Sequence, residues 1–193
     1  MGVSLTKGQK ISLDKESGRT LNKIFMGLGW DAAKKGGFLG RVLGGGGDID
    51  LDASCVMFSA DKQPVDAVYF GQLTSRDGSV RHSGDNLTGD GDGDDETINV
   101  TLADVPAEIH YLVFTVCSYR GQTFDEVANA YCRLVDDQNR EIARYAISGG
   151  GKFTAMIMAK LYRHNGEWKM HAVGESMNGA TVADMVKPIA AIL

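Results

Sequence analysis

Residues 109–117 read IHYLVFTVC, an almost unbroken run of aliphatic, aromatic and β-branched side chains. Residues of these types are typical of strands. A strand directs successive side chains to opposite faces, so a nearly continuous apolar run indicates that both faces are buried. We therefore expect residues 109–117 to form a central strand of a layered β structure.

Other segments with alternating apolar and polar side chains lie on both sides of this run, and turn residues separate them. The predicted strands are 23–30, 49–58, 66–70, 97–102, 130–135, 141–147, 153–162 and 168–173. Asn165-Gly166 favours a type I′ turn between the last two strands, and residues 136–139 (DDQN) predict a second hairpin. Many short strands joined by turns predict an all-β fold, a β-sandwich of two antiparallel-rich sheets.

Short peripheral helices are also expected. Thr123 and Glu126 have the spacing of a capping box and predict one turn of helix. Residues 181–193 favour a C-terminal helix, in which Pro188 should cause a break or a kink. With 193 residues, of which 43% are hydrophobic, the chain can bury a core, and we expect a single domain over residues 1–193.

Composition also bears on the compartment. The chain has no apolar stretch of signal-peptide length at its N-terminus and no run of about 18 apolar residues that would span a membrane. Cys55, Cys117 and Cys132 are far apart and lie in apolar stretches, which favours buried thiols in a reducing compartment. We therefore expect a cytoplasmic protein without a transmembrane segment.

The acidity of the chain is concentrated in residues 85–96, which read DNLTGDGDGDDE. Six of these twelve residues are carboxylates, whereas the rest of the chain carries a net charge of +1 within a total of −5. Carboxylates crowded onto a Gly-rich loop repel one another, and a hard divalent cation relieves that repulsion. Calcium takes about 6–8 oxygen ligands, so calcium is the cation that this segment favours.

The acidic segment matches neither of two known calcium templates. Counted from Asp90, an EF-hand would need Gly at the position of Asp95 and Glu at that of Thr101, and the segment occurs once rather than as a repeat. Asp50 and Asp52 share one face of a predicted strand, and Asp31 follows the end of an earlier strand. These side chains and the loop would form one or two calcium sites at one end of the sandwich. A solvated acidic loop is the alternative.

The sequence resembles the TerD domain family of bacterial tellurite-resistance and stress-response proteins, closest to the TerD/TerZ branch. The resemblance runs from about residue 3 to 173 and rests on 27–31 (GLGWD), 50–54 (DLDAS), 75–86 (SRDGSVRHSGDN), 88–89 (TG), 93–96 (GDDE), Phe124, 129–131 (NAY), 166–169 (GEWK) and 172–173 (AV). Residues 174–193 are poorly covered and are expected to be a C-terminal extension or helix. The Gly-rich segment 34–47 is longer than the family pattern suggests.

The resemblance implies a β-sandwich that binds calcium through acidic residues. We expect two Ca2+ ions and a module that is not an enzyme. The resemblance also implies a role in resistance to tellurite, certain phages and colicins, together with other tellurite-resistance proteins that include membrane-associated partners. The ligand positions that it carries over are Asp31, Asp50, Asp52, Asp85, Asn86, Thr88, Asp94, Asp95 and Glu96. Within the same loop, Asp92 fits by its chemistry, and Gly89 fits because glycine lets the backbone offer a carbonyl oxygen.

The sequence supports an enzyme function less well than it supports calcium binding. Residues 148–152 (SGGGK) suggest a phosphate-binding loop, but that motif needs Gly at Ala146 and Ser or Thr at Phe153, so we expect a hairpin connection there. His82 lies near the acidic segment and leaves open a metal-dependent hydrolase. A second alternative is an interaction scaffold that binds a basic partner through its acidic loop without calcium. No basic stripe with interleaved aromatic residues indicates nucleic-acid binding.

Overall fold

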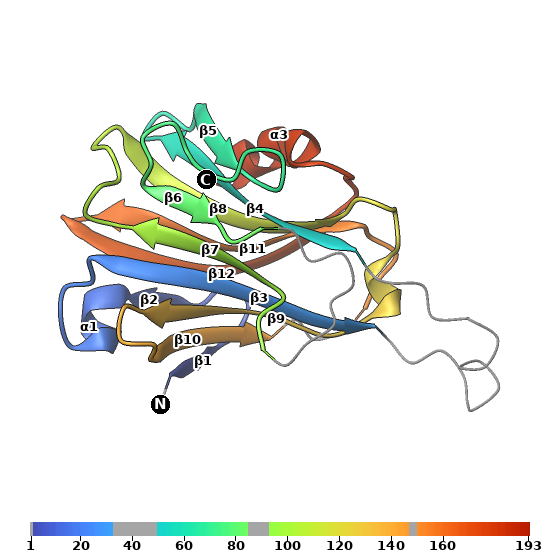
Figure 1. Ribbon diagram of the computed structural model, residues 1–193, viewed down its shortest axis with the longest axis horizontal. Coiled ribbons are helices and arrows are strands. Elements are labelled where there is room, and N and C mark those ends of the chain that lie inside the picture. The colour runs from blue at the N-terminus through green and yellow to red at the C-terminus, as the bar shows by residue number, and fades with distance from the viewer. Residues whose placement is uncertain (1, 33–49, 85–92, 147–149) are drawn as a thin grey trace.

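The computed structural model describes residues 2–32, 50–84, 93–146 and 150–193, with the backbone alone for residues 31 and 32. Two six-stranded sheets pack face to face (Figure 1), which confirms the predicted β-sandwich. The first sheet has the order β1 (Val3–Leu5), β10 (Glu141–Ala146), β9 (Val127–Asp136), β3 (Lys23–Ala32), β7 (Glu96–Thr101) and β6 (Val80–His82). The second has the order β2 (Lys10–Ser12), β12 (Glu167–Met177), β11 (Ala155–His164), β8 (Ile109–Ser118), β4 (Leu51–Ser59) and β5 (Pro64–Val68).

β8 contains the apolar run and lies inside the second sheet between β11 and β4, as predicted. Leu112, Phe114 and Val116 of β8 point into the core between the two sheets. Val113 and Cys117 point to the outer face, where they join a second apolar cluster. Both faces of β8 are therefore buried, and this is why its sequence lacks polar alternation.

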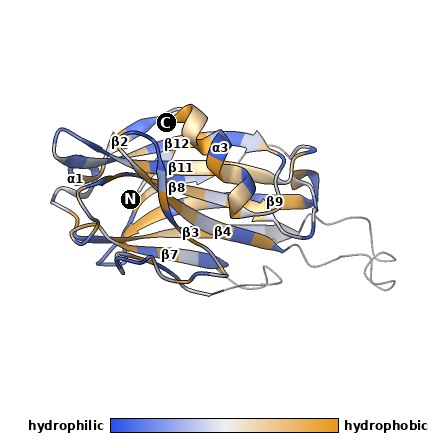
Figure 2. Ribbon diagram, turned by 90° about the horizontal axis from the view of Figure 1, so that it is seen from above, coloured by the Kyte–Doolittle hydropathy of each residue, from blue (hydrophilic) through white to orange (hydrophobic). Residues whose placement is uncertain are grey.

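The second apolar cluster is covered by the C-terminal helix α3 (Val182–Ile192), which lies across the outer face of the second sheet (Figure 2). Met185 and Ile189 of α3 are fully buried against that sheet. The helix is continuous through Pro188, so the expected break does not occur. Pro188 removes one backbone hydrogen bond, but burial of the apolar face provides most of the stability of a helix of this length.

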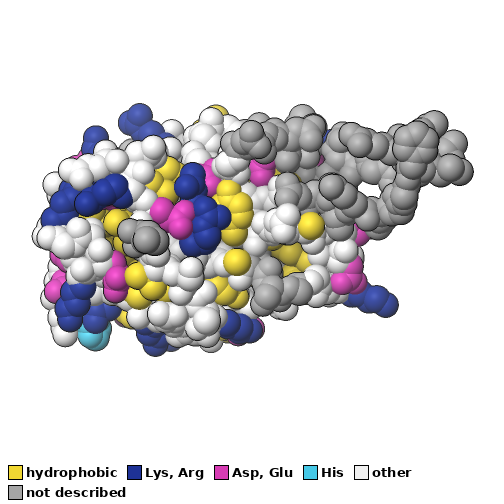
Figure 3. Space-filling view, turned by 90° about the horizontal axis from the view of Figure 1, so that it is seen from below, with side chains coloured by type: hydrophobic (Ala, Val, Ile, Leu, Met, Phe, Trp, Pro, Cys, Tyr) yellow, Lys and Arg dark blue, Asp and Glu magenta, His cyan; other side chains and the backbone are white. Residues whose placement is uncertain are grey.

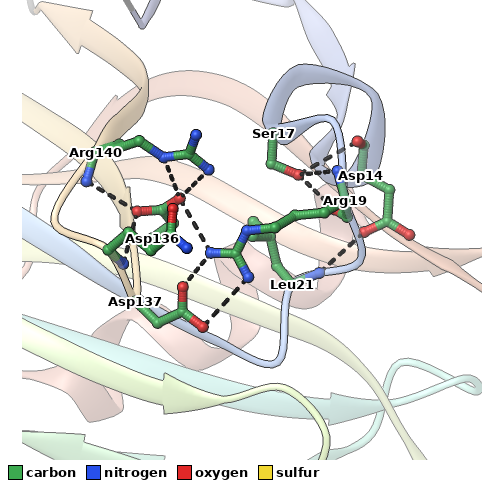
Figure 4. Close-up of polar contacts among 8 residues, drawn as sticks. Asp14, Ser17, Arg19, Leu21, Asp136, Asp137 and Arg140 are labelled. Carbon is green, nitrogen blue, oxygen red and sulfur yellow. Dashed lines mark hydrogen bonds and ion pairs between the residues drawn. The ribbon is translucent and has the colours of Figure 1, made fainter.

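The hairpins predicted at residues 136–139 and 165–166 both form, and every pairing between described strands is antiparallel except that of β1 with β10. Asn165 and Gly166 have φ values of 52° and 79°, as a type I′ turn requires. In the β9–β10 turn, Arg140 donates to the buried Asp136 carboxylate at 2.8 Å. Figure 4 shows Arg19, which follows helix α1 (Leu13–Ser17), reaching both Asp136 and Asp137 of this turn.

The short elements differ from expectation. Strands β1, β2 and β6 and helix α1 were not predicted, because three to five residues carry too little periodicity. Residues 124–126 form a single 3-10 turn, η1 (Phe124–Glu126), but the Thr123 side chain makes no capping hydrogen bond. The capping box forms instead between Thr181 and Asp184 at the start of α3.

The connection after β10 also corrects a prediction. β10 belongs to the first sheet and β11 to the second, so the segment between them passes from one sheet to the other and is not a hairpin. Residues 147–149 of this segment lie outside the described residues. In the described part, the Gly151 carbonyl accepts a hydrogen bond from the Asp125 N–H at 3.2 Å, which ties the crossing to η1.

The charged side chains and the three cysteines lie where the sequence analysis expected them. Acidic and basic side chains lie next to one another on the face shown in Figure 3. This agrees with the near neutrality of the chain outside residues 85–96. Cys55, Cys117 and Cys132 are all buried and free, so the prediction of buried core thiols is confirmed.

Candidate functional site

One end of the sandwich brings together several of the predicted site residues. Strand β3 ends there, β4 begins there, and β7 begins with the last residue of the acidic segment. The Trp30 N–H donates to Asp95 Oδ2 at 2.8 Å, and the Asp95 N–H donates to the Leu28 carbonyl at 2.8 Å. Asp95 is therefore held against the end of β3 by both its backbone and its side chain.

Glu96 is buried at the start of β7 and links the two sheets. Its Oε2 accepts a hydrogen bond from the Ala53 N–H of β4 at 2.6 Å. His82 of β6 places Nε2 3.3 Å from the same oxygen, and both side chains are fully buried. Since His82 Nδ1 accepts from the Gly84 N–H at 3.0 Å, the proton of a neutral imidazole lies on Nε2, which faces Glu96.

Asp94 turns to the outer face of the first sheet, away from Glu96. Arg133 Nε donates to both Asp94 carboxylate oxygens, at 2.8 and 3.1 Å, and the Tyr131 hydroxyl donates to Oδ1 at 3.1 Å. The carboxylate lies directly over Gly27 of β3, where a Cβ atom would overlap it. A Cβ at Gly29 would overlap the Tyr131 ring in the same way. The two glycines of the GLGWD segment therefore make room for these side chains.

Asp50 and Asp52 lie at the start of β4, and each is 4% exposed. Asp52 shares the outer face of the second sheet with Ser54, close to the first turn of α3. Asp50 Oδ2 is 3.0 Å from Arg120 Nε. Burial, together with the negative charges of Asp52, Asp184 and Glu96, raises the pKa of the neighbouring Cys117 thiol to about 12.

The other predicted site residues are described in part or not at all. Asp85, Asn86, Thr88, Gly89 and Asp92, as well as segment 34–47, lie outside the described residues. The backbone of Asp31 pairs with Ala128. Of the described positions, Asp50, Asp52, Asp95 and Glu96 lie at one end of the sandwich, whereas Asp94 is directed to another face.

The described carboxylates agree with a calcium site in donor type. Asp50, Asp52, Asp95 and Glu96 offer carboxylate oxygens, which are the ligands that calcium takes in proteins. Within the described ranges, however, no three Asp, Glu, His or Cys side chains converge as a group that could hold an ion. Further oxygen ligands would therefore have to come from elsewhere in the chain or from water.

Some residues of this end were not found by sequence reasoning. Arg133 of β9 and Arg120, in the turn after β8, pair with predicted site residues that are far away in the sequence, and no local pattern marks them. Asn129 has a φ of 51° within β9, at the point where its pairing with β3 shifts between Gly29 and Asp31. Such bulges are frequent next to functional sites. The NAY segment 129–131 was the one signal in the sequence that pointed to this position.

Comparison with known proteins identifies the family. The model of the TerD domain matches residues 1–188, from the first strand into helix α3. This chain belongs to the TerD domain family. Tellurium resistance protein TerZ of Serratia marcescens is 49% identical over 183 residues, which cover 95% of this chain and 94% of that protein.

Further relatives agree with the TerD assignment. Stress response protein SCP2 of Bacillus subtilis (strain 168) is 45% identical, with coverage of 96% of this chain and 98% of that protein. A crystal structure of a homologue of telluride resistance protein (TerD) from Streptomyces coelicolor A3(2) superposes with a TM-score of 0.71. That chain is 20% identical, and the match covers 88% of this chain and 98% of that one, so it supports the fold alone.

None of the described helices is long and apolar enough to cross a membrane.

Proposed function

We propose that this TerD-family protein is a calcium-binding, non-enzymatic module of a tellurium-resistance and stress-response system. Calcium bound at the carboxylate end of the sandwich orders the acidic segment, and the ordered segment presents a surface to partner proteins. The partners are other proteins of the same resistance system, some of them at the membrane. The proposed location of the protein is the cytoplasm.

The observation that carries the proposal is the burial of three carboxylates at the same end of the fold. Asp50 and Asp52 are each 4% exposed, and Glu96 is 1% exposed. Arg120 pairs with Asp50, and the Ala53 N–H donates to Glu96. A divalent cation coordinated by carboxylate oxygens at this end of the sandwich would add positive charge among these buried acidic groups.

A calcium titration of the full chain, followed by calorimetry, tests this proposal. We expect heat of binding with a stoichiometry of two ions and a higher melting temperature in calcium than in chelator, with a weaker effect of magnesium. When free calcium is about 100-fold above its dissociation constant, the free energy of unfolding should increase by about 2.7 kcal/mol. No heat together with an unchanged melting temperature would exclude calcium binding.

Variants of two proposed ligands test whether calcium binds at this site. Asp85→Asn and Asp95→Asn each remove one negative charge with little change in shape and should weaken calcium binding most. Asp61→Asn is the matched control, because Asp61 is exposed at the end of β4. Equal loss of affinity in Asp61→Asn would indicate an effect of total charge rather than a site.

The structure gives little support to the hydrolase alternative. His82, the candidate base that the sequence analysis named, has a fully buried side chain that faces Glu96. A general base must come within hydrogen-bond reach of the proton that it removes. The calcium-independent scaffold makes a different prediction from our proposal, because its partner binding would depend on salt and would not respond to chelator.

A further inference from the structure

A cavity of about 280 Å3 opens on the outer face of the second sheet. Its lining comes from Asp52 and Ser54 of β4, Cys117 of β8, Tyr69 and Phe70 after β5, and residues 181–183 at the start of α3. Pockets for drug-sized ligands and cofactors measure about 300–1,000 Å3. A cavity of this size therefore suits a single side chain better than a cofactor.

Aromatic rings form one wall of the cavity, and a further ring packs against that wall. The Phe70 ring packs edge-on against Tyr69 and Tyr119, with centroids 5.6 and 5.9 Å apart. Phe70 is 43% exposed and Tyr119 is 58% exposed, so both rings keep much of their surface open to solvent. Exposed aromatic rings around a cavity are typical of contact surfaces for partner proteins, and their faces attract cations.

A negatively charged side chain lies in the lining of the cavity. The Asp52 carboxylate is part of its lining. After burial, the charges of Asp52, Asp184 and Glu96 are the causes that raise the pKa of the Cys117 thiol in the same lining. A negative potential beside aromatic faces favours a cation with a flat or apolar body. The arginine guanidinium combines five hydrogen-bond donors, weak hydration and a planar shape that stacks on aromatic rings.

We propose that this cavity receives an arginine side chain of a partner protein. The guanidinium lies near Asp52 and stacks on the wall formed by Phe70, and the neighbouring residues of the partner lie on Tyr119. The inference rests on the proposed function in one respect, because that function supplies the need for a partner. The inference places the contact with the partner on the outer face of the second sheet, and it identifies arginine as the partner residue that is bound there.

The probe for this proposal is Nα-acetyl-arginine methylamide, titrated into the full chain and followed by amide NMR. We expect shift changes confined to Cys117, Phe70 and residues 181–183, with a dissociation constant in the millimolar range. The citrulline analogue has the same shape without the charge and should bind at least about tenfold more weakly. Equal binding of the citrulline or lysine analogue, or changes spread over the surface, would overturn the proposal.

Three variants locate the site without changing a carboxylate. Phe70→Ala removes the stacking face and should weaken the arginine probe about three- to fivefold, as expected for one exposed cation–π contact. Ala183→Phe should fill the cavity and abolish binding. Leu73→Ala is the matched control, because Leu73 is 45% exposed, close to the 43% of Phe70, and does not line the cavity. A normal melting temperature for Phe70→Ala keeps the test valid if Ala183→Phe fails to fold.

Because Asp52 belongs both to this cavity and to the calcium proposal, the two must be separated. Phe70→Ala should leave the heat of calcium binding unchanged. Arginine binding in a protein that takes up no calcium would support this inference and contradict the proposed function. Calcium binding without a response specific to arginine would overturn this inference and leave the proposed function standing.

Discussion

Arg133 Nε donates to both carboxylate oxygens of Asp94, at 2.8 and 3.1 Å, across the outer face of the first sheet. The next residue, Asp95, instead accepts the Trp30 N–H at the end of β3. Two adjacent acidic residues therefore have different electrostatic partners, a guanidinium for one and a backbone amide for the other. This difference separates their expected roles in calcium binding.

Asp95→Asn should weaken calcium binding by about tenfold or more, equivalent to about 1.4 kcal/mol. Asp94→Asn should change it less than about threefold, because the charge of Asp94 is already compensated by Arg133. Calorimetric titration of both variants at one ionic strength measures the difference. A larger loss for Asp94→Asn would show that the Arg133 pair opens when calcium binds.

Gly27→Ala should lower the free energy of unfolding by about 1–3 kcal/mol, because the new methyl group overlaps the Asp94 carboxylate. Urea denaturation measures the loss. In an Asp94→Ala background the overlap is absent, so the same glycine substitution should cost much less. Equal losses in the two backgrounds would mean that the effect arises elsewhere in β3.

Glu96→Ala should destabilise the fold by about 3–5 kcal/mol, since it leaves the buried Ala53 N–H without its acceptor and opens space beside the buried His82 ring. Glu96→Gln should cost less, because its amide oxygen can still accept from Ala53. Chemical denaturation of the two variants gives the comparison. Similar losses would indicate that the charge of Glu96, rather than its hydrogen bond to Ala53, determines stability there.

The β9–β10 turn makes stability depend on pH. Burial alone would raise the pKa of Asp136, but hydrogen bonds from the Arg140 and Gln138 N–H groups and the Arg140 side chain lower it below the usual 3.8. A lowered pKa stabilises the folded state above the unfolded value, and that stabilisation disappears as the pH falls through the folded value. Asp136→Asn should therefore flatten the loss of stability below about pH 4. Urea unfolding from pH 2 to 6 tests this, with Asp61→Asn as a control that keeps the parental slope.

The sequence was sufficient for the long strands and the hairpins because their signals are local. β8 is marked by its unbroken apolar run, and the β11–β12 turn by Asn165-Gly166. Strand β1 is three residues long and exists through its parallel pairing with β10, which lies about 140 residues away by its register of Val3 with Ala143. The continuity of α3 through Pro188 likewise depends on packing against the second sheet. These features follow from tertiary contacts, which a local pattern does not contain.

The sequence named acidic residues as candidates for the site, but it did not indicate the directions in which their side chains point. Sequence reasoning placed Asp94 and Glu96 together in one acidic loop. In the structure Asp94 lies outside the first sheet and Glu96 between the sheets, because the strand that begins at Glu96 fixes which way each side chain points. The arginine that compensates Asp94 lies 39 residues further along the chain. Gly27 and Gly29 were the local sign that large side chains cross this face of β3.

The three buried thiols have a consequence for chemistry with oxidants. Burial raises the pKa of Cys117 and Cys132 to about 12 and that of Cys55 further. At neutral pH these thiols are therefore almost entirely protonated, whereas the thiolate is the form that attacks electrophiles. We expect the three buried thiols to react slowly with oxidising anions while the protein is folded. The same thiols become reactive when the sandwich opens, so their rate of labelling by a disulfide reagent reports how often that opening occurs.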